Sequence, residues 1–137
     1  MEGAPVYLDT SAILRAVLET GATPEIEERL ARAPMLITSR LALVEAARAM
    51  LRLRREGRVA ESALADAERD IEALFRRCEI FELSPGVCDL AQQVAPGHAL
   101  RALDALHVAT FVLARRRLRT LELLTADERM RVAVSGA

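Results

Sequence analysis

The feature that most constrains the fold is the alternation of short apolar runs with longer segments of helical periodicity. Strand-like runs occupy residues 5–8, 35–38, 79–83 and 121–124, and each is followed by a helical pattern. Short buried strands that alternate with helices are typical of a parallel α/β sheet. We therefore expect residues 1–137 to form one α/β domain of three layers, a parallel sheet of four or five short strands flanked by helices.

The segments between the strand-like runs carry apolar residues at helical spacing. The pattern predicts helices over about 11–18, 24–33, 39–55, 61–76, 85–94 and 100–116, and a short last helix that opens near 125–128. Glycine or proline separates most of them, as at Gly21, Pro34 and Gly57. A fifth strand would be short or missing, reduced to residues 132–134.

The composition sets limits on the class of protein. Hydrophobic residues make up 52% and charged residues 28%, which suffices for a core and a soluble surface. Aromatic residues make up only 3%, so RNA binding by stacking of bases on aromatic rings is disfavoured. The net charge of −1 gives no overall basic footprint, although all 19 basic residues are arginines, which can grip phosphate through two points.

Cysteine usage and hydropathy indicate a cytoplasmic protein without a membrane segment. Cys78 and Cys88 are too few for a disulfide framework or a zinc site, and we expect both to be packed thiols. No stretch approaches the ~18 apolar residues of a membrane span. The N-terminal residues lack the basic start and hydrophobic core of a secretion signal.

Four acidic residues stand where a parallel sheet would gather them. Asp9 follows the first strand and Asp127 the fourth, Glu45 lies about two turns into the helix after the second strand, and Asp104 lies near the start of the helix that leads into the fourth. Sites in such sheets lie outside the carboxyl ends of the strands. Clustered carboxylates suit a hard cation such as Mg²⁺ or Mn²⁺, which can lower the pKa of a bound water and stabilise charge on a phosphate.

The segments around these acids resemble, in order and spacing, the motifs of PIN-domain nucleases, above all the VapC toxins. They are Tyr7-Leu8-Asp9-Thr10-Ser11-Ala12, Val44-Glu45 within residues 39–46, Leu103-Asp104-Ala105-Leu106-His107-Val108-Ala109 and Leu124-Thr125-Ala126-Asp127. Each motif alone is weakly specific, but four in register over nearly the whole chain are strongly so.

The resemblance implies a site and a function. Asp9, Glu45, Asp104 and Asp127 would be the catalytic and metal-binding acids, with Asp9 and Asp104 as direct ligands of Mg²⁺ or Mn²⁺. Glu45 and Asp127 would bind through water or serve a second metal, and Ser11 and Thr125 would support the carboxylates, the metal water or the phosphate. The chain would then be an endoribonuclease and the toxin of a type II toxin–antitoxin pair. It would act on RNA, form a homodimer and be silenced by a small antitoxin protein.

Three of these residues also have an ordinary structural interpretation. Asp9 suits a helix N-cap, and Thr125 with Glu128 fits a capping box. Glu45 could pair with Arg48 along an exposed helix face.

The residues at the two ends of the helix over about 100–116 are open to two interpretations. Asp104 is harder to explain structurally, because a carboxylate buried without a partner in an apolar helix costs several kcal/mol. His107, one turn on, is either packed or a partner of Asp104. The arginines at 115–117 and 119 could guide RNA or simply end the helix.

Two other kinds of function compete with the nuclease hypothesis. One is another Asp-based α/β phosphohydrolase, but phosphatases of that type carry Asp-x-Asp after the first strand, and here Thr10-Ser11 follow Asp9. A receiver domain would want a lysine in its acidic pocket, and the sequence contains none. The non-enzymatic rival is a PIN scaffold kept for binding or assembly, which would tend to lack one or more of the four acids.

Overall fold

The computed structural model describes residues 3–135, and its strands and helices follow the predicted alternation. Strands β1 to β4 span Val6–Leu8, Leu36–Ser39, Cys78–Phe81 and Glu122–Leu124. Helices α1 to α7 span Thr10–Leu18, Pro24–Arg32, Arg40–Glu56, Glu61–Arg76, Pro85–Ala91, Ala102–Arg117 and Glu128–Ser135.

The four strands form one parallel sheet in the order β3-β2-β1-β4. Tyr7 in β1 is in register with Ile37 in β2 and with Leu123 in β4. The chain therefore moves outward from β1 to β2 and β3, and then returns to place β4 on the other side of β1. This reversal makes the carboxyl ends of β1 and β4 the switch point of the sheet, which is where ligands bind in open α/β folds.

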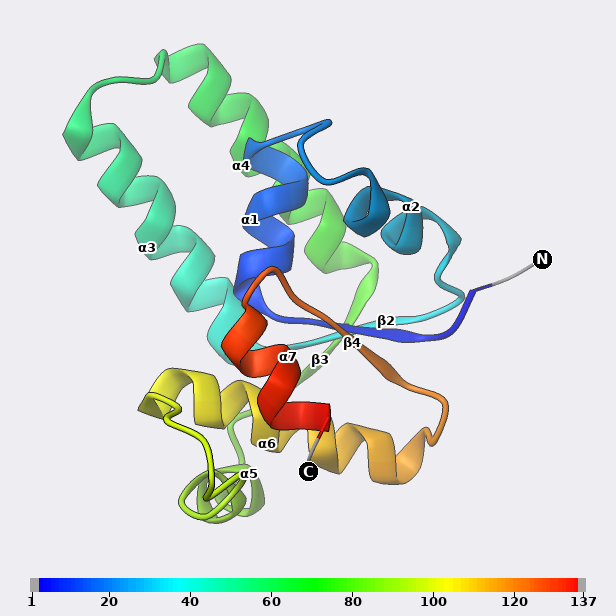
Figure 1. The fold of residues 1–137 in the computed structure, drawn as a ribbon. Helices are drawn as coiled ribbons and strands as arrows, with labels where there is room; N and C mark the ends of the chain where they lie inside the picture. The colour runs from blue at the N-terminus through cyan, green and yellow to red at the C-terminus, as the bar shows by residue number, and fades with distance from the viewer. Residues whose placement is uncertain (1–2, 136–137) are drawn as a thin grey trace.

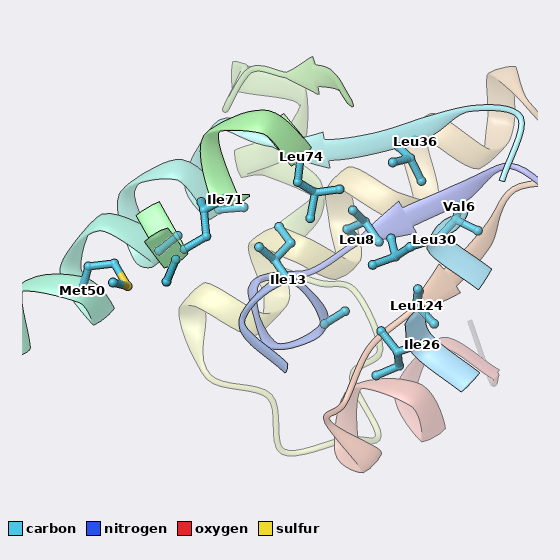
Figure 2. Close-up of a cluster of buried hydrophobic side chains, with 14 of the residues drawn as sticks. Val6, Leu8, Ile13, Ile26, Leu30, Leu36, Met50, Ile71, Leu74 and Leu124 are labelled. Carbon is cyan, nitrogen blue, oxygen red and sulfur yellow. The ribbon is translucent and has the colours of Figure 1, made fainter. Parts of the chain in front are cut away.

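Two separate cores cover the two faces of the sheet, which gives the expected three layers. In β1, the side chains of Val6 and Leu8 point to one core and that of Tyr7 to the other, as the period of two requires. Helices α1 to α4 pack on the first face, where Figure 2 shows Ile13 of α1 and Leu30 of α2 beside Leu8 of β1. Helices α5, α6 and α7 lie on the opposite side (Figure 1), and Phe111 and Met130 contribute to the second core.

Local signals in the sequence explain where several helices begin and end. Four helices start with a side chain that accepts a hydrogen bond from a backbone N–H of the first turn, namely Asp9 for α1, Ser39 for α3, Ser84 for α5 and Asp127 for α7. Helix α3 ends at Gly57, whose φ of 69° lies in the left-handed region that a residue without a side chain adopts readily.

The sheet has four strands, and within residues 3–135 the short fifth strand that the sequence left open does not form. Residues 132–134 belong to α7, in which Met130, Ala133 and Val134 are buried against the sheet at helical spacing while Val132 is exposed. Residues 79–83 were predicted as a strand, and β3 instead begins at Cys78 and ends at Phe81.

Two smaller predictions are also wrong. The capping box at the start of α7 does not form, because the backbone N–H groups of Arg129 and Met130 donate to Asp127 and not to Thr125. Cys88 is exposed and not packed, while Cys78 is half-buried, and both thiols are free. Within residues 3–135, no helix has the length and hydrophobicity that crossing a membrane requires.

Candidate functional site

A crevice is expected at the carboxyl ends of β1 and β4, because the helices that follow these strands leave on opposite faces of the sheet. Helix α1 contributes Ala12 and Ile13 to the core on one face, and α7 contributes Met130 and Val134 to the core on the other. Residues directly after the two strands, Asp9 and Thr125, therefore stand at the point where the chain diverges.

Asp9 and Thr125 are in direct contact across this switch point. The hydroxyl of Thr125 donates to Asp9 Oδ2 at 2.7 Å, and the hydroxyl of Ser11 lies 2.8 and 2.9 Å from the two oxygens of the same carboxylate. The backbone N–H of Ala12 donates to Oδ1 at 3.0 Å. The Ser11 and Thr125 hydroxyl oxygens are themselves 3.1 Å apart, so the three predicted residues form one cluster.

The Asp9 carboxylate is only 2% exposed, and every group that donates to it is neutral. Burial raises the pKa of Asp9, and the hydrogen bonds from Thr125, Ala12 and Ser11 oppose that rise without cancelling it. A buried carboxylate whose partners are all uncharged lacks a cation to offset its desolvation. A bound metal ion would supply that charge.

Glu45 belongs to a second cluster, which reaches the same end of the sheet from α3. Its Oε1 accepts a hydrogen bond from the Thr10 hydroxyl at 2.5 Å and lies 2.7 Å from His107 Nε2 in α6. Partial burial raises the pKa of Glu45, but the bonds from His107 and Thr10 outweigh it, so the net shift is downward. Glu45 therefore stays ionised, and its partners are Thr10 and His107 rather than Arg48.

The two clusters are joined through β1 and the start of α1. Asp9 and Thr10 are adjacent in the chain, and Thr10 is 9% exposed with its hydroxyl also 3.2 Å from His107 Nε2. Behind His107, the Tyr7 hydroxyl lies 2.9 Å from Nδ1. Burial raises the pKa of Tyr7 well above its ordinary value, and the nearby charge of Asp9 adds to the rise.

Asp127 is joined to the first cluster through the backbone. Its N–H donates to the Thr125 hydroxyl at 2.9 Å, and its Oδ1 accepts from the N–H of Arg129 at 2.9 Å. The carboxylate therefore caps α7, which is a structural role that the sequence analysis assigned to Thr125. Its side chain is 27% exposed, so it is also partly accessible to solvent.

Asp104 lies half-buried in the first turn of α6, one turn before His107. Within residues 3–135 its carboxylate forms no hydrogen bond or ion pair, and in particular none with His107, whose Nε2 is turned to Glu45. The arginines at the other end of α6 begin at Arg115, about 16 Å further along the helix axis. At that distance the arginines do not contact Asp104.

The four acids fit a hard divalent cation in their chemistry, since all offer carboxylate oxygens and no thiolate stands among them. Their arrangement is looser than a formed ligand set. Among the described residues, no group of three or more His, Cys, Asp or Glu side chains stands in a position to hold a metal ion. The structure thus brings Asp9 together with Ser11 and Thr125, and leaves Glu45, Asp104 and Asp127 in separate environments.

Sequence reasoning missed the parts of this site that depend on contacts far apart in the chain. Thr10 and Tyr7 were not predicted as site residues, and His107 was weighed only as a packed side chain or a partner of Asp104. A tyrosine in a buried strand does carry a signal, because its hydroxyl needs a hydrogen-bond partner. The partner, 100 residues away in α6, could not be read from that signal.

Comparison with known proteins decides the family. The family model described as the PIN domain matches residues 6–134. The chain belongs to the PIN-domain family. Among curated PIN relatives, ribonuclease VapC45 of Mycobacterium tuberculosis is 36% identical over 110 residues, which cover 77% of this chain and 73% of that protein.

Solved structures show the same PIN fold. PAE2754 from Pyrobaculum aerophilum has a TM-score of 0.69 at 22% identity, covering 98% of this chain and 82% of that one. VapC20 of Mycobacterium tuberculosis, described as a sarcin-ricin loop cleaving toxin, has a TM-score of 0.65 at 17% identity, covering 93% and 94%. A toxin–antitoxin complex from Klebsiella pneumoniae has a TM-score of 0.61 at 22% identity, covering 89% and 86%.

Proposed function

We propose that residues 1–137 form one PIN nuclease domain that acts as a Mg²⁺- or Mn²⁺-dependent endoribonuclease. The observation that carries the proposal is the Asp9 carboxylate, 2% exposed at the switch point of the sheet and bound only by neutral donors. Such a group is costly unless a cation or a proton compensates it. Membership of the PIN family and the likeness to VapC45, a named ribonuclease, favour the cation and the nuclease reaction.

We assign the metal ligands as the sequence motifs suggest. Asp9 and Asp104 would hold the ion directly, and Glu45 and Asp127 would act through water or on a second ion. Asp104 suits a direct role because no protein group in the described range already binds its carboxylate. The separation of the four acids favours ligation through water for the other two. A bound divalent ion supplies an activated water and a positive charge beside the phosphate.

The residues of the chain prepare the site before any ion binds. Thr125 and Ser11 hold the Asp9 carboxylate with their hydroxyls, so its two oxygens keep a fixed orientation. Asp127 is fixed at the start of α7 because its own N–H donates to the Thr125 hydroxyl and its Oδ1 accepts from the N–H of Arg129. Such preorganisation reduces what must be ordered when the metal and the RNA phosphate bind.

We further propose that the protein works in the cytoplasm as the toxin of a toxin–antitoxin pair, as a homodimer whose partner is a small antitoxin. The Klebsiella pneumoniae complex and the VapC relatives support that assignment. Exposed apolar residues on α3, with Val44 56% and Leu51 52% exposed, are available for protein contacts.

An RNA-cleavage assay with purified protein tests the proposed activity. We expect cleavage in Mn²⁺ or Mg²⁺ that stops in EDTA and is lost in Asp9→Asn and Asp104→Asn. Asp70→Asn, an exposed acid on α4, is the matched control and should cleave like the wild type. Equal cleavage by all variants would indicate a contaminating nuclease. Intact RNA under every condition, with no Mn²⁺ bound, would favour a PIN scaffold that serves binding or assembly.

A further inference from the structure

A chain of side-chain contacts runs from the buried sheet to Glu45. The Tyr7 hydroxyl in β1 lies 2.9 Å from His107 Nδ1, and His107 Nε2 lies 2.7 Å from Glu45 Oε1. The imidazole is 2% exposed, and its ring meets the Tyr7 ring edge-on with centroids 6.1 Å apart. Three elements that are distant in the sequence, β1, α6 and α3, thus meet in one line of polar atoms.

The chemistry of the partners fixes the direction of these hydrogen bonds. An ionised carboxylate only accepts, so the bond between Nε2 and Glu45 requires a proton on Nε2. A phenol keeps its proton at neutral pH and can donate it to Nδ1. The chain then reads Tyr7 O–H to Nδ1, and Nε2–H to Glu45 Oε1. A ring held at both nitrogens has neither rotational nor tautomeric freedom.

The Glu45 carboxylate is held on one side only. Among residues 3–135, its hydrogen bonds come from Thr10 at 2.5 Å and from His107 at 2.7 Å, and both reach Oε1 and not Oε2. The Glu45 side chain is 25% exposed while that of His107 is 3% exposed, so the carboxylate extends from a buried anchor toward solvent. With Oε1 held in place, the direction in which Glu45 Oε2 points is fixed as well.

We propose that His107 is a positioning residue, which holds Glu45 Oε1 so that Oε2 is presented to the metal or its water, and that Tyr7 fixes the imidazole in the orientation this needs. The role of His107 in metal binding rests on the proposed metal-dependent function. The hydrogen bonds from Tyr7 to His107 and from His107 to Glu45 can be tested without measuring activity. Side chains that orient a metal-binding group typically change metal affinity or activity by 10- to 100-fold when they are removed.

The first test is the protonation of the His107 ring, measured by long-range ¹H–¹⁵N NMR on the wild-type protein at neutral pH. His98, the only other histidine, lies exposed in a loop, and the His107→Gln spectrum assigns the two signals. We expect a protonated Nε2 and an Nδ1 signal that shifts in Tyr7→Phe. A proton on Nδ1 alone would overturn the proposal, because Nε2 could not then donate to Glu45.

The second test is Mn²⁺ affinity, measured by electron paramagnetic resonance titration. His107→Leu should weaken binding about 10- to 100-fold, and His107→Gln, which keeps an N–H donor near the position of Nε2, should restore most of the loss. Tyr7→Phe keeps the ring and its edge-on contact with Phe111 and should give a smaller loss. Wild-type affinity in both His107→Leu and Tyr7→Phe would overturn the proposal. If His107→Leu does not fold, wild-type affinity in Tyr7→Phe alone would overturn it.

A matched control separates positioning from general loss of stability. Ile71→Val removes one methylene from the core on the other face of the sheet and should leave Mn²⁺ affinity unchanged. Equal weakening in Ile71→Val and His107→Leu would overturn the proposal. If the wild type binds no Mn²⁺, the proposed function fails, and the ring-nitrogen measurement alone then decides whether His107 holds Glu45.

Discussion

The hydroxyl of Thr125 offers the sharpest test of how the Asp9 cluster is held. It donates to the Asp9 carboxylate at 2.7 Å and accepts the N–H of Asp127 at 2.9 Å, and the residue is only 2% exposed. Thr125→Val keeps the shape of the side chain and replaces the hydroxyl by a methyl group. The substitution therefore removes two hydrogen bonds with little change in packing.

The two bonds have different magnitudes. A hydrogen bond to a charged group contributes about 1.5–3 kcal/mol and one between neutral groups about 0.5–1.5 kcal/mol. We therefore expect Thr125→Val to lower the free energy of unfolding by about 2–4 kcal/mol. In urea, where small proteins lose about 1–3 kcal/mol per molar, the midpoint should fall by about 1 M or more.

A double-mutant cycle with Asp9→Asn isolates the bond to the carboxylate. Asparagine has nearly the same volume but carries no charge, so Thr125→Val should cost about 1 kcal/mol less in the Asp9→Asn protein than in the wild type. The hydrogen bond from Thr125 lowers the Asp9 pKa, and the stability it contributes is present when Asp9 is ionised. It is lost as the pH falls through the folded-state pKa of Asp9.

The measurement is urea unfolding of the wild type, both single variants and the double variant, followed by circular dichroism at neutral and at acidic pH without metal. Independent sites add within about 0.5 kcal/mol. An equal cost of Thr125→Val in both backgrounds at neutral pH, within that margin, would refute the claim that the hydroxyl holds a charged Asp9.

Three further predictions follow from burial and charge. Burial raises the Asp9 pKa above its unfolded value, so the stability of the wild type falls as the pH rises through the folded pKa. The stability of Asp9→Asn relative to the wild type should therefore increase from acidic to neutral pH. Urea midpoints of the two proteins that do not converge in acid would contradict this. Burial raises the Cys78 pKa to about 11, so iodoacetamide at pH 8 should label exposed Cys88 first, and equal labelling in a mass-spectrometric time course would contradict it. Ile13→Ala, in a fully buried position, should lower the free energy of unfolding in urea by about 2–5 kcal/mol. Glu82→Gln, which breaks an exposed pair with Arg40, should leave it unchanged within experimental error. A larger loss of stability in Glu82→Gln than in Ile13→Ala would contradict the packing described.

Much of the fold could be predicted because the sequence is locally consistent. The strand runs are short and apolar, and the helices between them start at capping residues such as Ser39 and Ser84 and stop at residues such as Gly57. The order β3-β2-β1-β4 could not be predicted in the same way, because it depends on which strands pair across long crossings.

The helical conformation of residues 132–134, the possible remnant of a fifth strand, has an identifiable reason. The run Val132-Ala133-Val134 has the β-branched composition of a strand, but the positions that are buried, Met130, Ala133 and Val134, have the spacing of a helix. Packing of that face on the sheet overrides the local preference of valine for strands.

The contacts among the candidate site residues could be predicted only in part. The position of Asp9 and Thr125 after two parallel strands predicts that they lie at the same edge of the sheet, and the structure places them in contact. The bond of His107 to Glu45 spans 62 positions in the sequence, and nothing local distinguishes it from a bond to Asp104, one turn away. The sequence analysis assigned the cap of the last helix to Thr125, yet Asp127 caps α7.

The most direct test of the central claim is a crystal structure of the protein soaked in Mn²⁺, with the ion located by its anomalous scattering. We expect a peak in the crevice at the carboxyl ends of β1 and β4, within the ~2.0–2.6 Å range of oxygen ligands to hard cations from Asp9 and Asp104. A Mn²⁺ ion bound elsewhere, or a crevice that stays without Mn²⁺ while the Thr125 and Asp9 contacts are unchanged, would contradict the proposed metal centre.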